Sequence, residues 1–274
     1  MKKIVYKGMD RSELDAAYNN TKAVSNFPEL LSQLRKRSCQ TYAAHSWQRN
    51  IPYGAKERER YDFVSCGPSA AATYVFIHGG YWSNCVKEDF AFIADAFIKH
   101  NINIVLAEYT LAPEASMTEI VAQTGKLIDR LAADRDGLGI AERPLYLGGH
   151  SAGGHLALMH RAHPAVAKVH AISALVDLEP IGLCWLQDTL NLTSEEIENY
   201  SPIRHIGKGA PTLITVGASE LTGLRQQSTE YALACEDAGE GVALIHLPGS
   251  THFSILDDLS DPEGWQLRAL LSLA

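Results

Sequence analysis

The sequence predicts an α/β fold in which helices cover both faces of a mostly parallel central sheet and a small helical cap is added. Two observations support this prediction. From residue 61 onward, short apolar runs alternate with helix-length segments, which is the pattern of successive β-α-β units. Several of these runs are continuous and rich in β-branched residues, as expected for strands buried on both faces. The 274 residues and 46% hydrophobic content are ample for a buried core.

The alternating part and two additional segments account for the chain. Strands are expected at 61–65, 73–77, 103–107, 144–147, 168–173, 212–216 and 242–246, and helices at 87–99, 117–134, 152–163, 224–237 and 262–271. An N-terminal helical segment is expected within about 10–50, continuous over 10–37, and a cap-like insertion at about 180–200. No repeat, low-complexity tract or linker divides the sequence, so residues 1–274 are expected to form a single domain.

Composition excludes several kinds of partner. The 24 Lys and Arg against 32 Asp and Glu give a net charge of −8, and a concentrated basic face for nucleic acid is not expected. The N-terminal lysines precede no apolar run, and no stretch is long enough to cross a bilayer, so no export signal or membrane partner is expected. The cysteines are odd in number and scattered, which favours reduced thiols and a cytoplasmic location; they are Cys39, Cys66, Cys85, Cys184 and Cys235.

The strongest chemical signal is the pentapeptide Gly149-His150-Ser151-Ala152-Gly153, a match to G-x-S-x-G. An apolar strand precedes it and a helical run follows it, which is the context of a nucleophile elbow. The glycines let neighbouring backbones approach the strained turn. Ser151 is therefore the predicted nucleophile of an α/β-hydrolase fold.

A second motif, His78-Gly79-Gly80-Tyr81-Trp82, ends an earlier strand. Glycine N–H groups there can turn toward a carbonyl oxygen, so Gly79 and Gly80, with the N–H of Ala152, are the predicted oxyanion hole. The alternative is a plain Gly-Gly turn.

The base is predicted from the order serine, acid, histidine that this fold follows. His78 precedes the serine, and His170 and His246 lie within predicted strands. His252 lies in the loop after the last strand and is the predicted base.

The acid has three candidate positions. Glu220 follows the penultimate strand, where it would hold the imidazole tautomer. Asp177, after the preceding strand, is the main competitor, and Asp257 and Asp258 are interpreted as solvated charges.

These motifs resemble the arylformamidase (kynurenine formamidase) branch of the esterase and lipase α/β hydrolases. The resemblance also rests on residues 17–20, 109–114, 217–220 and 251–253, and it spans most of the chain. It implies hydrolysis of N-formylkynurenine or another aryl amide or ester. Two positions depart from related esterases: Tyr81 replaces a third glycine, and His150 replaces aspartate before the nucleophile. Glu220 likewise stands where aspartate is commoner.

The predicted function is therefore a serine hydrolase that forms an acyl-enzyme on Ser151, acting on a small-molecule acyl substrate with an aromatic group. Tyr81, Trp82 and Trp185 are the predicted substrate-binding residues, and Lys87 and Arg225 are candidate cations for a substrate carboxylate. No metal or organic cofactor is expected. The alternatives are a general short-chain carboxylesterase and a non-catalytic ligand-binding module. The sequence is compatible with a homodimer.

Overall fold

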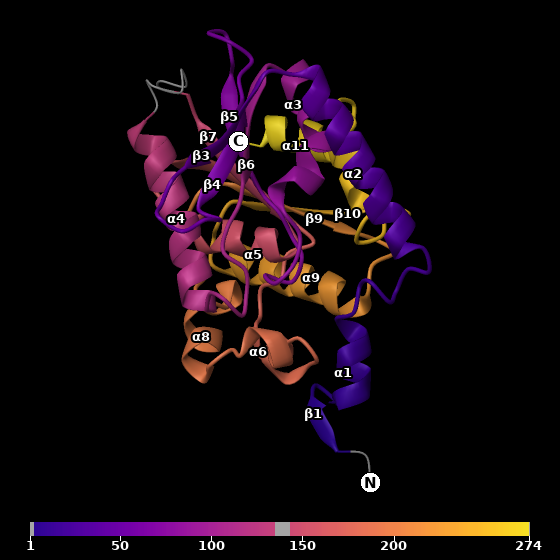
Figure 1. Cartoon of the computed structure of the whole chain (residues 1–274). Coiled ribbons are helices and arrows are strands. Elements are labelled where there is room, and N and C mark those ends of the chain that lie inside the picture. Colours follow the sequence, from indigo (N-terminus) through magenta and orange to yellow (C-terminus); the bar gives the residue numbers. More distant parts are fainter. Residues whose placement is uncertain (1–2, 135–142, 274) are drawn as a thin grey trace.

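The computed structural model describes residues 3–134 and 143–273. Met1 and Lys2, part of the N-terminal stretch considered above, lie outside the described residues. The chain forms an eight-stranded sheet with helices on both faces, and a two-stranded hairpin lies near the N-terminus (Figure 1). That hairpin consists of β1 (Ile4–Tyr6) and β2 (Met9–Asp10).

The large sheet is mostly parallel, as predicted. In spatial order the strands are β10 (Val242–Leu247), β9 (Thr212–Gly217), β8 (Val166–Ile172), β7 (Leu145–His150), β5 (Ala72–Ile77), β6 (Ile102–Ala107), β4 (Arg60–Val64) and β3 (Trp47–Pro52). The six strands from β10 to β6 are parallel to one another, whereas β4 pairs antiparallel with β6 and β3 pairs antiparallel with β4 at one edge. The edge strand β3 was not predicted, because most of its side chains are exposed and carry no apolar run.

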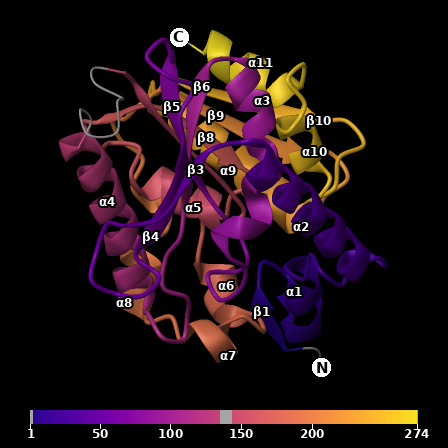
Figure 2. The same ribbon diagram turned by 45° about the horizontal axis from the view of Figure 1, so that its top comes forward.

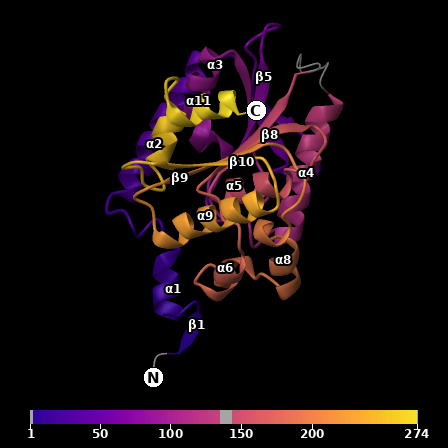
Figure 3. The same ribbon diagram turned by 180° about the vertical axis from the view of Figure 1, so that it is seen from behind.

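Alternate side chains of the central strands enter two separate cores. Val75 and Ile77 of β5 pack into the core shared with α4 (Met117–Ala133), α5 (Ala152–Met159) and α9 (Thr222–Asp237). Figure 3 shows these three helices together on that side. Tyr74 and Phe76 face the other core, which contains η1 (Lys87–Ile93), α3 (Ala94–Lys99), α10 (Ile255–Leu259) and α11 (Trp265–Ser272).

The predicted continuous helix over 10–37 is wrong. The structure has α1 (Arg11–Ala17), an irregular segment, and then α2 (Phe27–Ala44). Within the irregular segment, the Asn19 side chain accepts hydrogen bonds from the Thr21 hydroxyl at 2.9 Å and the Lys22 amide at 3.1 Å. Such local bonds compete with the helical pattern, which explains the interruption.

The helix expected over 262–271 begins later than predicted. It is α11, which starts at Trp265, and a separate short helix, α10, ends at Leu259 before the expected segment begins. The Asp258 carboxylate accepts the N–H groups of Trp265 and Gln266, each at 2.9 Å. These bonds satisfy N–H groups that have no partner within α11, so the Asp258 side chain fixes where α11 begins.

The insertion before β9 forms three short helices at one end of the molecule. They are α6 (Glu179–Leu183), α7 (Gln187–Leu190) and α8 (Ser194–Asn199), followed by the single turn η2 (Pro202–Arg204). Figure 2 shows α6 beside the N-terminal hairpin and α1. This helical cap lies at the end of the sheet where the loops after β7 and β9 emerge. No helix in the described ranges combines the length and apolar character needed to span a bilayer.

Candidate active site

Ser151 occupies a sharp turn between β7 and α5. Its backbone is left-handed, with φ 56° and ψ −117°, which is unfavourable for a residue with a Cβ atom. The flanking glycines are required by close contact: a Cβ on Gly149 would lie 2.2 Å from the Gly153 carbonyl oxygen, and one on Gly153 would lie 2.0 Å from that of Ile77. The turn therefore has the form of a nucleophile elbow.

His252 and Glu220 meet across the loops that follow β10 and β9. The Nδ1 of His252 lies 2.7 Å from Oε2 of Glu220. The other carboxylate oxygen of Glu220 accepts the Ser173 hydroxyl at 2.5 Å and the Gly217 amide at 2.7 Å. Because a carboxylate accepts, Nδ1 is the donor, and Nε2 is left as the basic nitrogen of a neutral ring.

The competing carboxylates have other partners. Asp177 accepts the Tyr6 hydroxyl at 3.1 Å and the Glu179 amide at 3.0 Å. Asp257 pairs with Arg37 at 2.5 Å, and Asp258 caps α11. The structure thus joins Glu220, rather than any of these three, to His252.

The predicted oxyanion residues surround the elbow. A Cβ on Gly79 would lie 3.1 Å from the Ser151 Cβ, so these two backbones approach closely. Gly80 has φ 107°, and a Cβ there would lie 2.3 Å from the Asn84 carbonyl oxygen. Ala152 is the first residue of α5, where an N–H group has no intrahelical partner. The arrangement leaves backbone donors near the serine.

A charged network behind this loop was not predicted. His78 contacts the Gly79 carbonyl oxygen through Nδ1 at 2.7 Å and Glu108 through Nε2 at 2.9 Å. Arg58 also binds Glu108, at 2.7 Å. Burial raises the pKa of Glu108, but His78, Arg58 and the Lys87 amide outweigh it and lower that pKa to about 2. The sequence signal was an acidic residue directly after the apolar strand β6.

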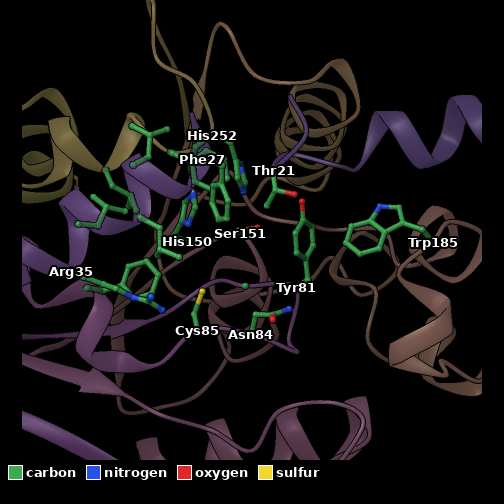
Figure 4. Close-up of a pocket in the computed structure, with 17 residues that line it drawn as sticks. Thr21, Phe27, Arg35, Tyr81, Asn84, Cys85, His150, Ser151, Trp185 and His252 are labelled. Atoms are coloured by element: carbon green, nitrogen blue, oxygen red, sulfur yellow. Dashed lines mark hydrogen bonds between the residues drawn. The ribbon is translucent and has the colours of Figure 1, made fainter. Parts of the chain in front are cut away.

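Ser151, His252 and His150 line one cavity of about 320 Å³. Figure 4 shows Ser151 near its middle, with Arg35 toward one end and Trp185 toward the other. The contribution of α2 to this cavity was not predicted, because its apolar residues have no recognisable functional motif. The apolar side chains of the wall are Phe27, Leu30, Leu31, Leu34, Phe90, Phe253 and Leu256.

Two of the three predicted aromatic contacts line the cavity. Tyr81 and Trp185 do so, with ring centroids 5.3 Å apart in an edge arrangement. Trp82 does not line it, which corrects the prediction. Its side chain is fully buried, and its Nε1 donates to Nδ1 of His155 at 3.2 Å. Trp82 therefore packs inside the protein, away from the cavity.

The cation of the cavity also differs from those predicted. Lys87 is buried and binds Asn50 at 2.8 Å and Asp62 at 3.3 Å, and neither it nor Arg225 lines the cavity. Arg35 of α2 does line it, and binds Asp89 at 2.8 and 3.3 Å.

Other reactive groups near the serine do not form a competing centre. Burial raises the pKa of the cavity thiol Cys85 to about 12, so it stays protonated and is a poor nucleophile. Among the described residues, no cluster of three or more His, Cys, Asp or Glu has the arrangement to hold a metal ion.

Comparisons with known proteins agree with this architecture. Residues 67–178 match the family model BD-FAE. The chain is 26% identical to the kynurenine formamidase of Danio rerio over 288 residues, covering 97% of each chain. It is 28% identical to that of Salmo salar over 241 residues, covering 82% of this chain and 81% of the other.

Solved structures have the same fold. A candidate thioesterase from Silicibacter sp. superposes with a TM-score of 0.85 at 22% identity, covering 95% of this chain and 99% of that one. An esterase from Pyrobaculum calidifontis gives 0.71 at 18% identity, covering 90% and 94%. The fold and the elbow therefore define a hydrolase of the α/β-hydrolase class. Within that class, the chain is similar to the arylformamidases of the esterase and lipase branch.

Proposed function

We propose that the chain hydrolyses an aryl formamide of the N-formylkynurenine type through a formyl-enzyme on Ser151. The observation that carries the proposal is the contact of 2.7 Å between His252 and Glu220 beside a serine in a strained elbow. The similarity to two kynurenine formamidases supports the choice of an aromatic amide substrate.

The chemistry proceeds in two halves. His252 removes the proton from Ser151 as its oxygen attacks the formyl carbon, and backbone N–H groups of Gly79, Gly80 and Ala152 stabilise the oxyanion. The imidazolium, stabilised by Glu220, then protonates the leaving nitrogen, and the C–N bond breaks. Water, deprotonated by His252, attacks the formyl ester; return of that proton to the Ser151 oxygen releases formate and restores the serine.

The dimensions of the cavity support a substrate with one aromatic group. A volume of about 320 Å³ with largely apolar walls suits a phenyl ring and a short side chain. The edge-on pair of Tyr81 and Trp185 offers one aromatic surface for such a ring. The second candidate is a short-chain carboxylesterase, favoured by the leucines of α2, because Leu30, Leu31 and Leu34 would also accommodate an aliphatic acyl chain.

The first test is a comparison of specificity constants for N-formylkynurenine and p-nitrophenyl butyrate. We expect N-formylkynurenine to be the better substrate, and a strong preference for butyrate would establish the esterase instead. The Ser151→Ala variant should lose turnover of both compounds, and near-full turnover would refute the nucleophile assignment. Failure of a fluorophosphonate probe to label folded wild-type protein would favour the non-catalytic alternative.

A further inference from the structure

His150, which immediately precedes the nucleophile, has a role that neither the triad nor the oxyanion hole uses. Its Nε2 lies 2.8 Å from the backbone carbonyl oxygen of His252, and the two imidazole rings have centroids 4.6 Å apart. The side chain is buried and lines the cavity together with Ser151. His150 therefore lies next to both the nucleophile and its predicted base.

The hydrogen bond fixes the tautomer of this ring. A carbonyl oxygen only accepts, so Nε2 of His150 carries the proton and Nδ1 keeps a lone pair. Burial, followed by the neighbouring His252, lowers the pKa of His150 well below its usual range, so the ring stays neutral. Within the described part of the chain, no side chain or amide donates to Nδ1. The ring thus offers an unused acceptor.

This acceptor and the nucleophile both approach the backbone of Gly79. A Cβ atom on Gly79 would lie 2.8 Å from the His150 carbonyl oxygen, 3.1 Å from Cβ of Ser151 and 3.2 Å from Nδ1 of His150. The position is too crowded for a side chain, so Nδ1 of His150 and Cβ of Ser151 lie against the same side of Gly79. Figure 4 shows His150 beside Ser151 and His252 at the cavity wall.

An amide places a demand on such a site that an ester does not. After Ser151 attacks, the lone pair of the leaving nitrogen must point to the proton on His252, so the N–H bond of that nitrogen points elsewhere in the cavity. A buried N–H without an acceptor is costly, and this cost falls on the transition state. An ester oxygen at the same position carries no hydrogen.

We propose that Nδ1 of His150 accepts the hydrogen bond from the reacting N–H and thereby selects amides over esters. This inference rests on the proposed formamidase function, since it concerns the leaving nitrogen of that reaction. The hydrogen bond from Nε2 of His150 to the His252 carbonyl oxygen, by contrast, positions the base for every substrate. The two nitrogens of one ring would thus have separable effects.

Formanilide and phenyl formate test the proposal, because they share the formyl and phenyl groups and differ at the leaving atom. In the His150→Phe variant, the ratio of kcat/KM for formanilide to that for phenyl formate should fall by roughly tenfold to a hundredfold. Loss of the bond to His252 should lower both constants together and leave the ratio unchanged. In His150→Gln, the side-chain oxygen restores an acceptor, so much of the ratio should return.

The outcomes separate the two hypotheses. Equal loss on both substrates in His150→Phe would overturn the acceptor role and leave His150 as a positioning residue. Wild-type protein that cleaves phenyl formate but not formanilide would overturn the formamidase function and the acceptor with it. If His150→Phe fails to fold, wild-type protein is assayed with formanilide and N-methylformanilide, which lacks the N–H. A loss of tenfold or more on N-methylation is expected, and equal rates would refute the proposal.

Discussion

Two buried pairs of histidine and glutamate lie near Ser151, and they differ in what the second nitrogen of the imidazole contacts. His252 meets Glu220 at 2.7 Å, and His78 meets Glu108 at 2.9 Å. The other nitrogen of His78 binds the Gly79 carbonyl oxygen at 2.7 Å. Within the described residues, the other nitrogen of His252 has no hydrogen-bond partner. Only His252 is therefore free to exchange a proton with a substrate.

A carboxylate beside a histidine therefore does not by itself define a base. Both nitrogens of His78 are engaged, one with the Gly79 carbonyl oxygen and one with the Glu108 carboxylate, so neither is available to a substrate. Arg58 also binds this carboxylate. The first pair leaves one imidazole nitrogen open, as a base requires, whereas the second holds the backbone at Gly79.

The largest expected effect comes from breaking the pair at His252. In Glu220→Gln, the amide no longer stabilises the imidazolium or enforces its tautomer, so kcat should fall by about 10³- to 10⁴-fold. Steady-state kinetics on N-formylkynurenine or formanilide measures this fall. The control is Asp177→Asn, because Asp177 contacts Tyr6 and the first turn of α6 rather than His252. This variant should retain activity within a few fold. A smaller loss in Glu220→Gln than in the control would show that another group serves as the acid.

Breaking the other pair should mainly reduce stability. The pKa of Glu108 is about 2 in the fold against an ordinary value near 4.5, so its charge contributes about 3 kcal/mol at neutral pH. A lowered carboxyl pKa gives stability that is present above pH 4.5 and is lost as the pH falls toward 2. Glu108→Gln should therefore lower the free energy of unfolding by about 3 kcal/mol at pH 7.

Urea unfolding at pH 7 measures that change, and kcat at low temperature separates it from an effect on the oxyanion loop. We expect kcat to fall by roughly tenfold or less, because Gly79 and Gly80 lose rigidity without losing their N–H groups. The matched exposed control is Glu119→Gln, at a carboxylate that pairs with Lys56 on the surface. Equal unfolding energies for the two variants would contradict a stabilising role for Glu108.

Other buried histidines have no carboxylate partner, and their effect depends on pH. Burial lowers the pKa of His155 to about 4 and that of His170 to about 3, so both are neutral in the fold. The unfolded chain binds their protons below pH 6.5, so stability is complete above that pH and declines as the pH falls. Each ring should lower the free energy of unfolding by about 1.4 kcal/mol between pH 7.5 and pH 5.5.

Denaturant unfolding at pH 7.5, 6.5 and 5.5 reports the combined decline. In His170→Gln, which retains polar atoms near Tyr74 and Thr215, the decline between pH 7.5 and pH 5.5 should become smaller by about 1.4 kcal/mol. An unchanged dependence of the unfolding free energy on pH in this variant would mean that His170 contributes nothing to it and is protonated in the fold.

The sequence was sufficient for every strand of the sheet except the edge strand β3, and for the residues of the elbow, because these depend on local patterns. The strand and helix boundaries follow apolar runs, and Ser151 lies in a motif whose glycines are needed within two residues of it. Glu108, Arg58 and α2 are different. Their contacts link positions 30 to 50 residues apart or more, and no spacing in the sequence reveals such proximity. Trp82 was misplaced for the same reason: neighbours in a loop can point to opposite sides.

Tyr81 and Phe253, which lie shortly after His78 and His252 in the sequence, both line the cavity. Phe253 lies on the side of the cavity that α2 covers. Leu31 of α2 lines that side. In Leu31→Trp, the larger side chain should fill this side of the cavity and lower kcat/KM for p-nitrophenyl butyrate by about tenfold. The formyl ester p-nitrophenyl formate should change by less than about threefold, because its acyl group is a single carbon. Equal losses would mean that the leaving aromatic ring, rather than the acyl chain, occupies the space beneath α2.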